Sequence, residues 1–259
     1  MTTSTVSFEG VKKAVFFPFR GEKWGIKMLI GSALTFGGFI IPIVPLLPVF
    51  GYFGQIMKGI IVQEQDPEMP AWNDWGTLFV DGLKLLGAEL IYLLPSLILI
   101  IGGYALFMAL DLTMGLSAAT LAQNSANAFP LVIVASMFGM FIGMAVLLLW
   151  IALAVVTALI LPPAIGNMLA KGKFEAAFHF GEWWPVLKAN LGGFILAGAV
   201  TLGLFYLMYM LAIVLYATII LCFLLPFVLA AIFFITGTTG FSVCAVAYRD
   251  GVRKIAVGD

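Results

Sequence analysis

The sequence predicts an all-α fold, a polytopic integral membrane protein with six transmembrane helices arranged as three hairpins. Three observations predict this class. First, 63% of the 259 residues are hydrophobic and only 10% are charged, whereas soluble domains are about 25% charged. Second, the apolar stretches are long enough to cross a bilayer, which takes about 20 helical residues. Third, all thirteen Lys and Arg residues lie on or close to one side of these stretches.

The chain has three expected parts. These are an N-terminal interfacial segment over residues 1–25, a single six-span membrane domain over 26–250, and a C-terminal tail over 251–259. Between residues 4 and 19, apolar residues and lysines recur at helical spacing, which is typical of a helix lying in the headgroup region. We therefore expect interfacial helices on the cytoplasmic side.

Residues 26–62 are almost wholly apolar but are too long for one span. Prolines near the middle of this stretch indicate a turn. We expect two short helices, about 26–41 and 46–62, with a single long kinked helix as the alternative.

The only long polar stretch, residues 63–84, holds five of the thirteen acidic residues. It leads into the third expected span, 83–110. Residues 111–128 are small and polar with one charge, and they predict a loop.

The fourth span is expected between Pro130, which suits the first turn of a helix, and about Leu161, where a Pro-Pro pair follows. Residues 171–188 predict an amphipathic connector rich in Phe and Trp. Residues 191–246 carry no charge and fit two spans. Tyrosines favour membrane interfaces, so the turn between these spans is predicted near 207–218, from Tyr206, Tyr209 and Tyr216.

The distribution of positive charge supports this topology. With six spans, every Lys and Arg falls at or near the N-terminal segment, the polar stretch, the connector or the tail, and none lies in the three turns. Cytoplasmic segments are enriched in Lys and Arg. Both termini are therefore predicted to be cytoplasmic in a multi-pass protein of the cell membrane.

Glu89 is an acidic residue inside the third span. A charged side chain there costs about 2.5–3.5 kcal/mol on insertion scales, so it usually faces the bundle interior or water. Tyr92 and Ser96 lie on the same helical stripe, and we treat the three as a candidate intramembrane polar site. The alternatives are that Glu89 is solvated or paired near the interface, one turn beyond Lys84, or that it contacts a partner protein.

Gln55, Asn167 and Asn190 lie near the cytoplasmic ends of the second, fourth and fifth spans. Polar side chains at such positions usually bond across helices. If the three converge, they form a polar cluster facing the cytoplasm.

Gly139 and Gly143, with Ala135 before them, form a ridge of small residues on the fourth span. Such ridges let helices pack closely. The contact is expected either within the bundle or between subunits.

Four tryptophans are expected to anchor the chain at the membrane interface, namely Trp24, Trp72, Trp75 and Trp184. Three of them precede a glycine by seven or eight residues, which indicates a weak threefold repeat, with coincidence as the alternative. The carboxylates around Trp72 are expected to point away from anionic headgroups or to find basic partners, with Lys12, Lys13 and Arg20 as candidates.

No residue pattern indicates catalysis or a cofactor. His179 lies near Glu175 and Glu182 on one helical face, but these residues also make an ordinary polar surface, and we expect no metal. Cys222 and Cys244 lie in apolar runs, where a thiol behaves as a small hydrophobe. Nucleophile, zinc-protease and phosphate-loop motifs are absent, so we expect no enzymatic activity. A formal net charge of zero excludes a nucleic-acid partner.

The polar stretch carries a resemblance. Gly51-Tyr52 to Lys58-Gly59, then Pro70-Ala-Trp-Asn-Asp-Trp-Gly and Asp81-Gly82-Leu-Lys, resembles the prokaryotic membrane family called domain of unknown function 4013. The resemblance covers roughly residues 20–250. It implies a multi-span membrane protein of a prokaryote and supplies no catalytic or binding residues.

For function, we expect a non-enzymatic structural or assembly component. It would contact membrane lipids and pack with other membrane protein subunits or as a homo-oligomer. The scarcity of intramembrane charge and the abundance of Gly, Met and Phe favour this role. The alternative is a small-solute transporter or channel, since proline-broken helices and internal repeats occur in many transporters.

Overall fold

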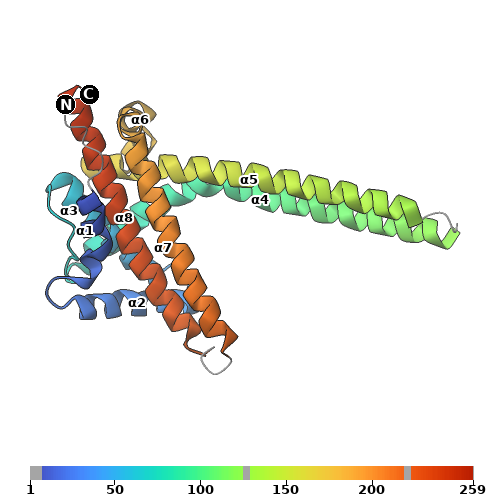
Figure 1. Cartoon of the computed structure of the whole chain (residues 1–259), viewed down its shortest axis with the longest axis horizontal. Coiled ribbons are helices and arrows are strands. Elements are labelled where there is room, and N and C mark those ends of the chain that lie inside the picture. Colours follow the sequence, from blue (N-terminus) through green and yellow to red (C-terminus); the bar gives the residue numbers. More distant parts are fainter. Residues whose placement is uncertain (1–7, 125–128, 219–222, 259) are drawn as a thin grey trace. The chain divides into compact units, whose positions relative to one another are not determined.

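The computed structural model describes residues 8–124, 129–218 and 223–258, and all regular structure in these ranges is helical (Figure 1). The main helices follow in chain order: α1 Phe8–Phe16, 3₁₀ helix η1 Phe17–Phe19, α2 Trp24–Ile40, α3 Leu46–Val62, α4 Trp75–Asn124, α5 Phe129–Lys171, 3₁₀ helix η2 Phe174–Phe178, α6 Phe180–Ala189, α7 Leu191–Ala217 and α8 Leu225–Val257.

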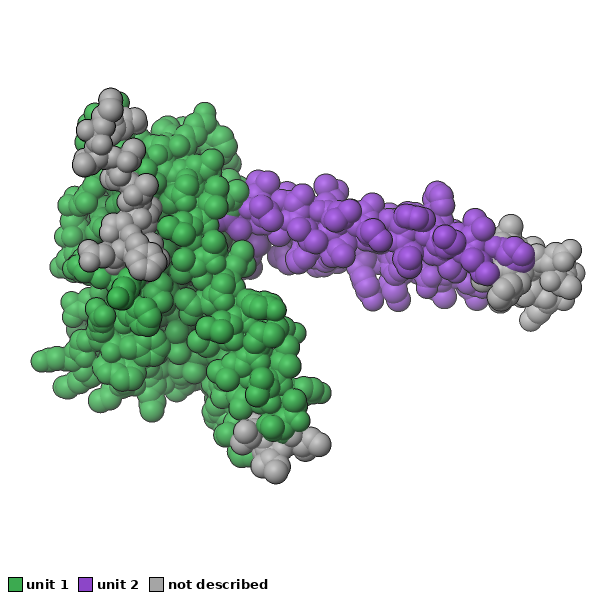
Figure 2. All heavy atoms as spheres, viewed as in Figure 1, with its two compact units in different colours: residues 1–89, 159–259 green, residues 90–158 purple. Residues whose placement is uncertain are grey.

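The chain forms two compact units (Figure 2). Unit 1 comprises Met1–Glu89 and Leu159–Asp259, and unit 2 comprises Leu90–Ala158. Helices α4 and α5 each contribute to both units, so the two units are described in turn.

Helix α8 is the centre of unit 1 and contacts α1, α2, α3, α6 and α7. Figure 1 shows it running alongside α7. Its glycines explain the close packing, because they leave room for side chains from neighbouring helices. The ring of Phe53 lies where a Cβ would stand on Gly237, and Thr201 lies against Gly240.

Aromatic rings fill the core between α3 and α8. Tyr52, Phe53 and Phe234 are each at most 1% exposed. Phe53 lies 5.8 Å from Phe234 and 5.2 Å from Phe241 between ring centroids. Aromatic pairs at such distances contribute about 0.5–1.5 kcal/mol each beyond their burial.

Helices α3 and α4 approach each other through two glycines. A Cβ on Gly51 would overlap the carbonyl of Leu78, and a Cβ on Gly82 would overlap the carbonyl of Leu47. Backbone thus packs directly on backbone. This contact brings the two ends of the polar stretch together.

Unit 2 is a helix pair made from the second part of α4 and most of α5. Gly143 receives the ring of Phe107, with 3.3 Å from an ideal Cβ to the ring, and Gly103 receives Val146. The predicted small-residue ridge therefore packs within this pair. Gly139 is buried on the same helix, and Ala135 is not described at the side-chain level.

The loop predicted at 111–128 is wrong for most of its length, because α4 continues to Asn124. Leu, Ala and Met in this stretch are good helix formers. Its hydroxyl groups donate hydrogen bonds to backbone carbonyls of the preceding helical turn, Thr113 to Leu110 and Ser117 to Thr113. Residues 125–128 lie outside the described residues.

The prolines expected to end the fourth span lie inside α5 instead, which continues to Lys171. Pro162 and Pro163 lack N–H groups, so the carbonyls four residues earlier lose their intrahelical donors. Membrane helices tolerate this loss better than exposed ones, because neighbouring groups can satisfy the backbone again.

Two boundaries near the C-terminus also differ from prediction. Helix α7 ends at Ala217 and α8 begins at Leu225, so α7 continues through almost the whole region in which the turn was predicted, 207–218. The tyrosines used to place it are exposed side chains of α7, and an interface preference does not mark a helix end. The expected tail at 251–259 is helical through Val257.

Helix length and composition indicate a membrane protein. Within the described ranges, four helices are long and apolar enough to cross a bilayer, at Trp75–Ser117, Ser136–Lys171, Leu191–Ala217 and Leu225–Val257. Helices α2 and α3 have 17 residues each and are shorter apolar helices. They are separated at residues 41–45, so the alternative of one kinked helix is wrong.

Candidate functional site

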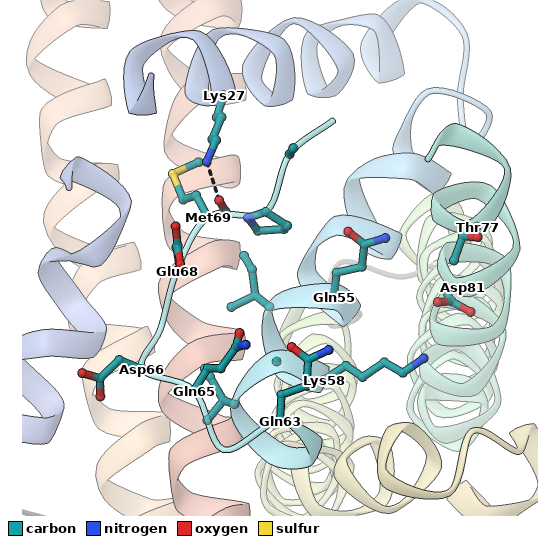
Figure 3. Close-up of a pocket in the computed structure, with 15 residues that line it drawn as sticks. Lys27, Gln55, Lys58, Gln63, Gln65, Asp66, Glu68, Met69, Thr77 and Asp81 are labelled. Carbon is teal, nitrogen blue, oxygen red and sulfur yellow. Dashed lines mark hydrogen bonds between the residues drawn. The ribbon is translucent and has the colours of Figure 1, made fainter. Parts of the chain in front are cut away.

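The polar stretch lies along a hollow of unit 1 that is lined largely by polar side chains. We call it the polar basin; its volume is about 540 Å³. Figure 3 shows Gln55 and Lys58 of α3, the extended segment and the start of α4 arranged around it. Its labelled lining residues are Lys27, Gln55, Lys58, Gln63, Gln65, Asp66, Glu68, Met69, Thr77 and Asp81.

Two aromatic residues hold the extended segment against the core. Trp72 stacks on Tyr52 with 4.1 Å between ring centroids. The Tyr52 hydroxyl donates to the Pro70 carbonyl at 3.0 Å, and the Trp72 indole N–H donates to the Lys27 carbonyl at 3.1 Å. Lys27 Nζ donates in return to the Met69 carbonyl at 2.6 Å. We call these contacts the tryptophan clamp.

Two acidic side chains of the segment form solvent-exposed ion pairs at its outer edge. Lys13 lies 3.2 Å from Asp66, which confirms one expected basic partner. Lys12 and Arg20 form no such pair within the described ranges. Arg253 of α8, which the sequence did not indicate, lies 2.7 Å from Glu64.

The start of α4 is capped by Asp74, whose carboxylate accepts the backbone N–H of Thr77 at 3.2 Å. Hydrogen bonds from the Thr77 side chain and backbone lower the pKa of Asp74. The spacing from Asp74 to Thr77 is that of an N-cap. This N-cap pattern is visible in the sequence, but the start of the helix was not predicted from it.

The basin keeps several polar groups unengaged. Gln55, Gln63, Gln65 and Lys58 have no side-chain hydrogen bond or ion pair among the residues that the structure describes, whereas Asp81 lies 3.8 Å from Lys84. Three carboxamides and one ammonium can together form hydrogen bonds with a small polar solute, and the carboxylates of Asp66, Glu68 and Asp81 also line the basin.

Asn167 and Asn190 do not join Gln55 in the basin. Asn167 donates to the Ala176 carbonyl and to Glu182, both at 2.8 Å. Asn190 donates to the Ala247 carbonyl at 2.8 Å. Both amides are buried. Asn167 joins α5 to the connector, and Asn190 joins the start of α7 to α8.

Glu182 is the acidic partner in the connector. It forms an ion pair with Lys171 and accepts a hydrogen bond from Asn167, and these contacts lower its pKa, with Lys171 the larger cause. His179 lies 3.7 Å from Glu182. Among the described residues, no group of three His, Cys, Asp or Glu side chains could hold a metal ion.

The candidate intramembrane residues divide between the two units. Glu89 belongs to unit 1, and Tyr92 and Ser96 belong to unit 2. Ser96 is 4% exposed and its hydroxyl has no hydrogen-bond partner among the described residues. Glu89 lines a second, apolar hollow of unit 1.

The predicted anchors differ in exposure. Trp24, Trp75 and Trp184 are each 42% exposed, as an interface anchor requires. Trp72 instead packs in the tryptophan clamp. Sequence reasoning missed Trp183, which is fully buried and donates from its indole to the Ala177 carbonyl at 3.0 Å.

The third copy of the expected repeat departs from the first two. Trp24 and Trp75 each begin a helix, but Trp184 lies inside α6. Gly31 packs against Phe234, whereas Gly192 has no neighbour within 4 Å of an ideal Cβ.

These helices, with a polar basin beside an aromatic core, define a polytopic α-helical membrane protein. Comparison with known proteins places it further. The family model described as Protein of unknown function (DUF4013) matches residues 34–217. The chain therefore belongs to the DUF4013 family, and this match includes the whole polar stretch. No curated protein and no solved structure matches the chain.

Proposed function

We propose that this protein is a non-enzymatic component of a prokaryotic plasma membrane that packs against partner membrane proteins or further copies of itself through unit 2. One observation carries the proposal. Residues 90–158 contain a single charged residue, Asp111, and their large apolar side chains remain exposed along both helices.

The outward faces of unit 2 suit protein contacts. Phe138 and Phe141 are 64% and 63% exposed, and three exposed methionines lie near them on α5, Met137, Met140 and Met144. Methionine adapts its shape to irregular partners. The small residues of the pair already receive Phe107 and Val146, so the larger residues form the free surface.

The polar basin favours the second candidate, a transporter or channel for a small solute. The unengaged amides of the basin and Lys58 could bind such a solute. However, Asn167 and Asn190 are engaged with the connector and α8, and this division of the polar groups favours the packing role.

Cysteine crosslinking tests the packing role. In a background with Cys222→Ala and Cys244→Ala, Phe141→Cys in membranes is expected to give a disulfide-linked dimer or a crosslink to a membrane partner. Leu202→Cys, 69% exposed on α7 of unit 1, is the control and is expected to give less. Native mass spectrometry should show the same species. A strictly monomeric protein with no crosslink at Phe141→Cys would refute the role.

The proposal includes six spans with both termini in the cytoplasm. Helices α2 and α3 are about 25 Å long at about 1.5 Å per residue, close to the lower limit for a span of about 17 residues. Whether α2 and α3 both cross the membrane or neither does, α4 begins on the same side, so the later helices keep the same orientation. Only the turn at residues 41–45 distinguishes the two topologies.

Labelling by a membrane-impermeant thiol reagent on intact cells tests this topology. In the same cysteine-free background, Ser117→Cys and Val44→Cys are both expected to react from outside, and Asn73→Cys only after permeabilisation. Reaction at Ser117→Cys but not at Val44→Cys would show that α2 and α3 do not cross. Reaction at Ser117→Cys only after permeabilisation would overturn the orientation.

A further inference from the structure

Unit 1 contains a second hollow of different character, which we call the aromatic groove. Its volume is about 340 Å³, at the lower end of the about 300–1,000 Å³ of small-molecule sites. Five helices of unit 1 line it, and its key residues are Phe53, Glu89, Thr201, Phe205, Phe233 and Cys244.

The groove has a closed floor and an open mouth. Phe53 stacks on Phe241, with 5.2 Å between centroids, and packs into the space over Gly237. At the mouth, Phe205 and Phe233 are 57% and 42% exposed. Both belong to helices long and apolar enough to cross a membrane, so the mouth is open to hydrocarbon chains.

Charge is what distinguishes this groove from ordinary membrane-facing surface. Glu89 is the only charged residue among those that line it. The described residues provide Glu89 with no ion pair and no hydrogen bond, and the nearest basic residue on α4, Lys84, pairs with Asp81. The Thr201 hydroxyl is also engaged, since it donates to the Ala197 carbonyl.

An unpaired carboxylate beside aromatic rings selects its occupant by chemistry. A neutral hydrocarbon chain fills the groove but leaves Glu89 without a partner, and an anionic lipid adds like charge. A protonated amine with a single hydrocarbon chain supplies Glu89 with a hydrogen-bond donor and a positive charge. Its hydrocarbon chain packs on the aromatic rings, and the faces of these rings also attract the ammonium.

We propose that the aromatic groove binds a single-chain amphiphile with a protonated amine, its ammonium at Glu89 and its chain between Phe53, Phe205 and Phe233. This site is independent of the packing role of unit 2, so either can fail alone.

Cys244, which lines the groove and is partly exposed, provides a direct reporter. In purified protein carrying Cys222→Ala, dodecylamine is expected to slow alkylation of Cys244 by monobromobimane at about tenfold lower concentration than dodecanol does, because a charge-assisted hydrogen bond changes affinity by about tenfold or more. Glu89→Gln should abolish this preference. Asp111→Asn, which removes the other lone acid of α4, should preserve it.

Equal protection by dodecylamine and dodecanol would overturn the proposal, as would an amine preference that survives Glu89→Gln. Absence of protection by either probe would also overturn it. The comparison of the two probes requires no change at Glu89, so it decides the question even where Glu89→Gln fails to fold.

Discussion

Removing the ring of Trp72 should release the polar stretch from the core. Trp72→Ala loses the partial burial of the ring, worth about 2 kcal/mol or half the value for a fully buried aromatic. It also loses about 1 kcal/mol of stacking on Tyr52 and about 1 kcal/mol from the hydrogen bond to Lys27. We expect the free energy of unfolding to fall by about 3–4 kcal/mol.

Trp72→Phe separates these contributions. It keeps an aromatic ring opposite Tyr52 and removes the indole donor, so a loss of about 1 kcal/mol is expected. Denaturation in detergent micelles gives the free energies. Limited proteolysis within residues 63–74 should accelerate in the same order, because the segment is held by this ring.

Trp184→Ala is the matched control. Trp184 is 42% exposed and has Lys188 Nζ 5.5 Å from its ring centroid, a contact worth about 0.5–1 kcal/mol at exposed sites. If Trp72→Ala costs no more than Trp184→Ala, the tryptophan clamp does not stabilise the fold and the reasoning is refuted.

Three further predictions test other contacts. Gly51→Ala should destabilise the protein strongly or prevent its folding, since its Cβ would meet the Leu78 carbonyl, whereas Gly102→Ala, with no neighbour within 4 Å, should be neutral or stabilising by about 0.5–1 kcal/mol in thermal denaturation. Asn190→Ala should cost about 1–3 kcal/mol because it removes two hydrogen bonds, one to the Ala247 carbonyl and one from Lys254, each worth about 0.5–1.5 kcal/mol. Exposed Asn73→Ala should change the unfolding midpoint little, and similar midpoints for both variants would contradict the role of these bonds. Because its partners lower the folded-state pKa of Glu182, Glu182 stabilises the protein above its unfolded pKa of about 4.3, and this stabilisation is lost as pH falls through the lower folded pKa. The melting temperature should therefore fall more for the wild type than for Glu182→Gln as pH is lowered below about 4.3, and parallel curves would show that the contacts do not stabilise the fold.

The sequence predicted α2 and α3 well because prolines separate two apolar runs, and proline acts locally. It failed at the ends of α4 and α5 for two different reasons. Residues 111–124 are polar yet compatible with a helix, and Pro162 and Pro163 lie where other helices surround the backbone. Whether proline ends a membrane helix depends on neighbours that periodicity does not reveal.

The candidate site was predictable in part. The polar stretch was identified from its composition, and Lys13 from its charge. The pairing of Arg253 with Glu64 spans 189 positions in sequence, and the stacking of Trp72 on Tyr52 depends on glycines that bring α3 and α4 together. Such contacts are set by tertiary packing, so a single sequence leaves Trp72 indistinguishable from an interface anchor.

The central place of α8 has a consequence for biogenesis. The helices that it contacts, α1, α2, α3, α6 and α7, precede it in the chain. The surfaces with which they contact α8 are therefore uncovered until α8 has been synthesised. Until α8 is inserted, Gly31 and Phe53 lack the segment that covers them. Assembly of unit 1 is therefore delayed until translation of this helix, and a ribosome that stops before residue 225 would leave a chain that is inserted but unassembled, a natural target for membrane quality control.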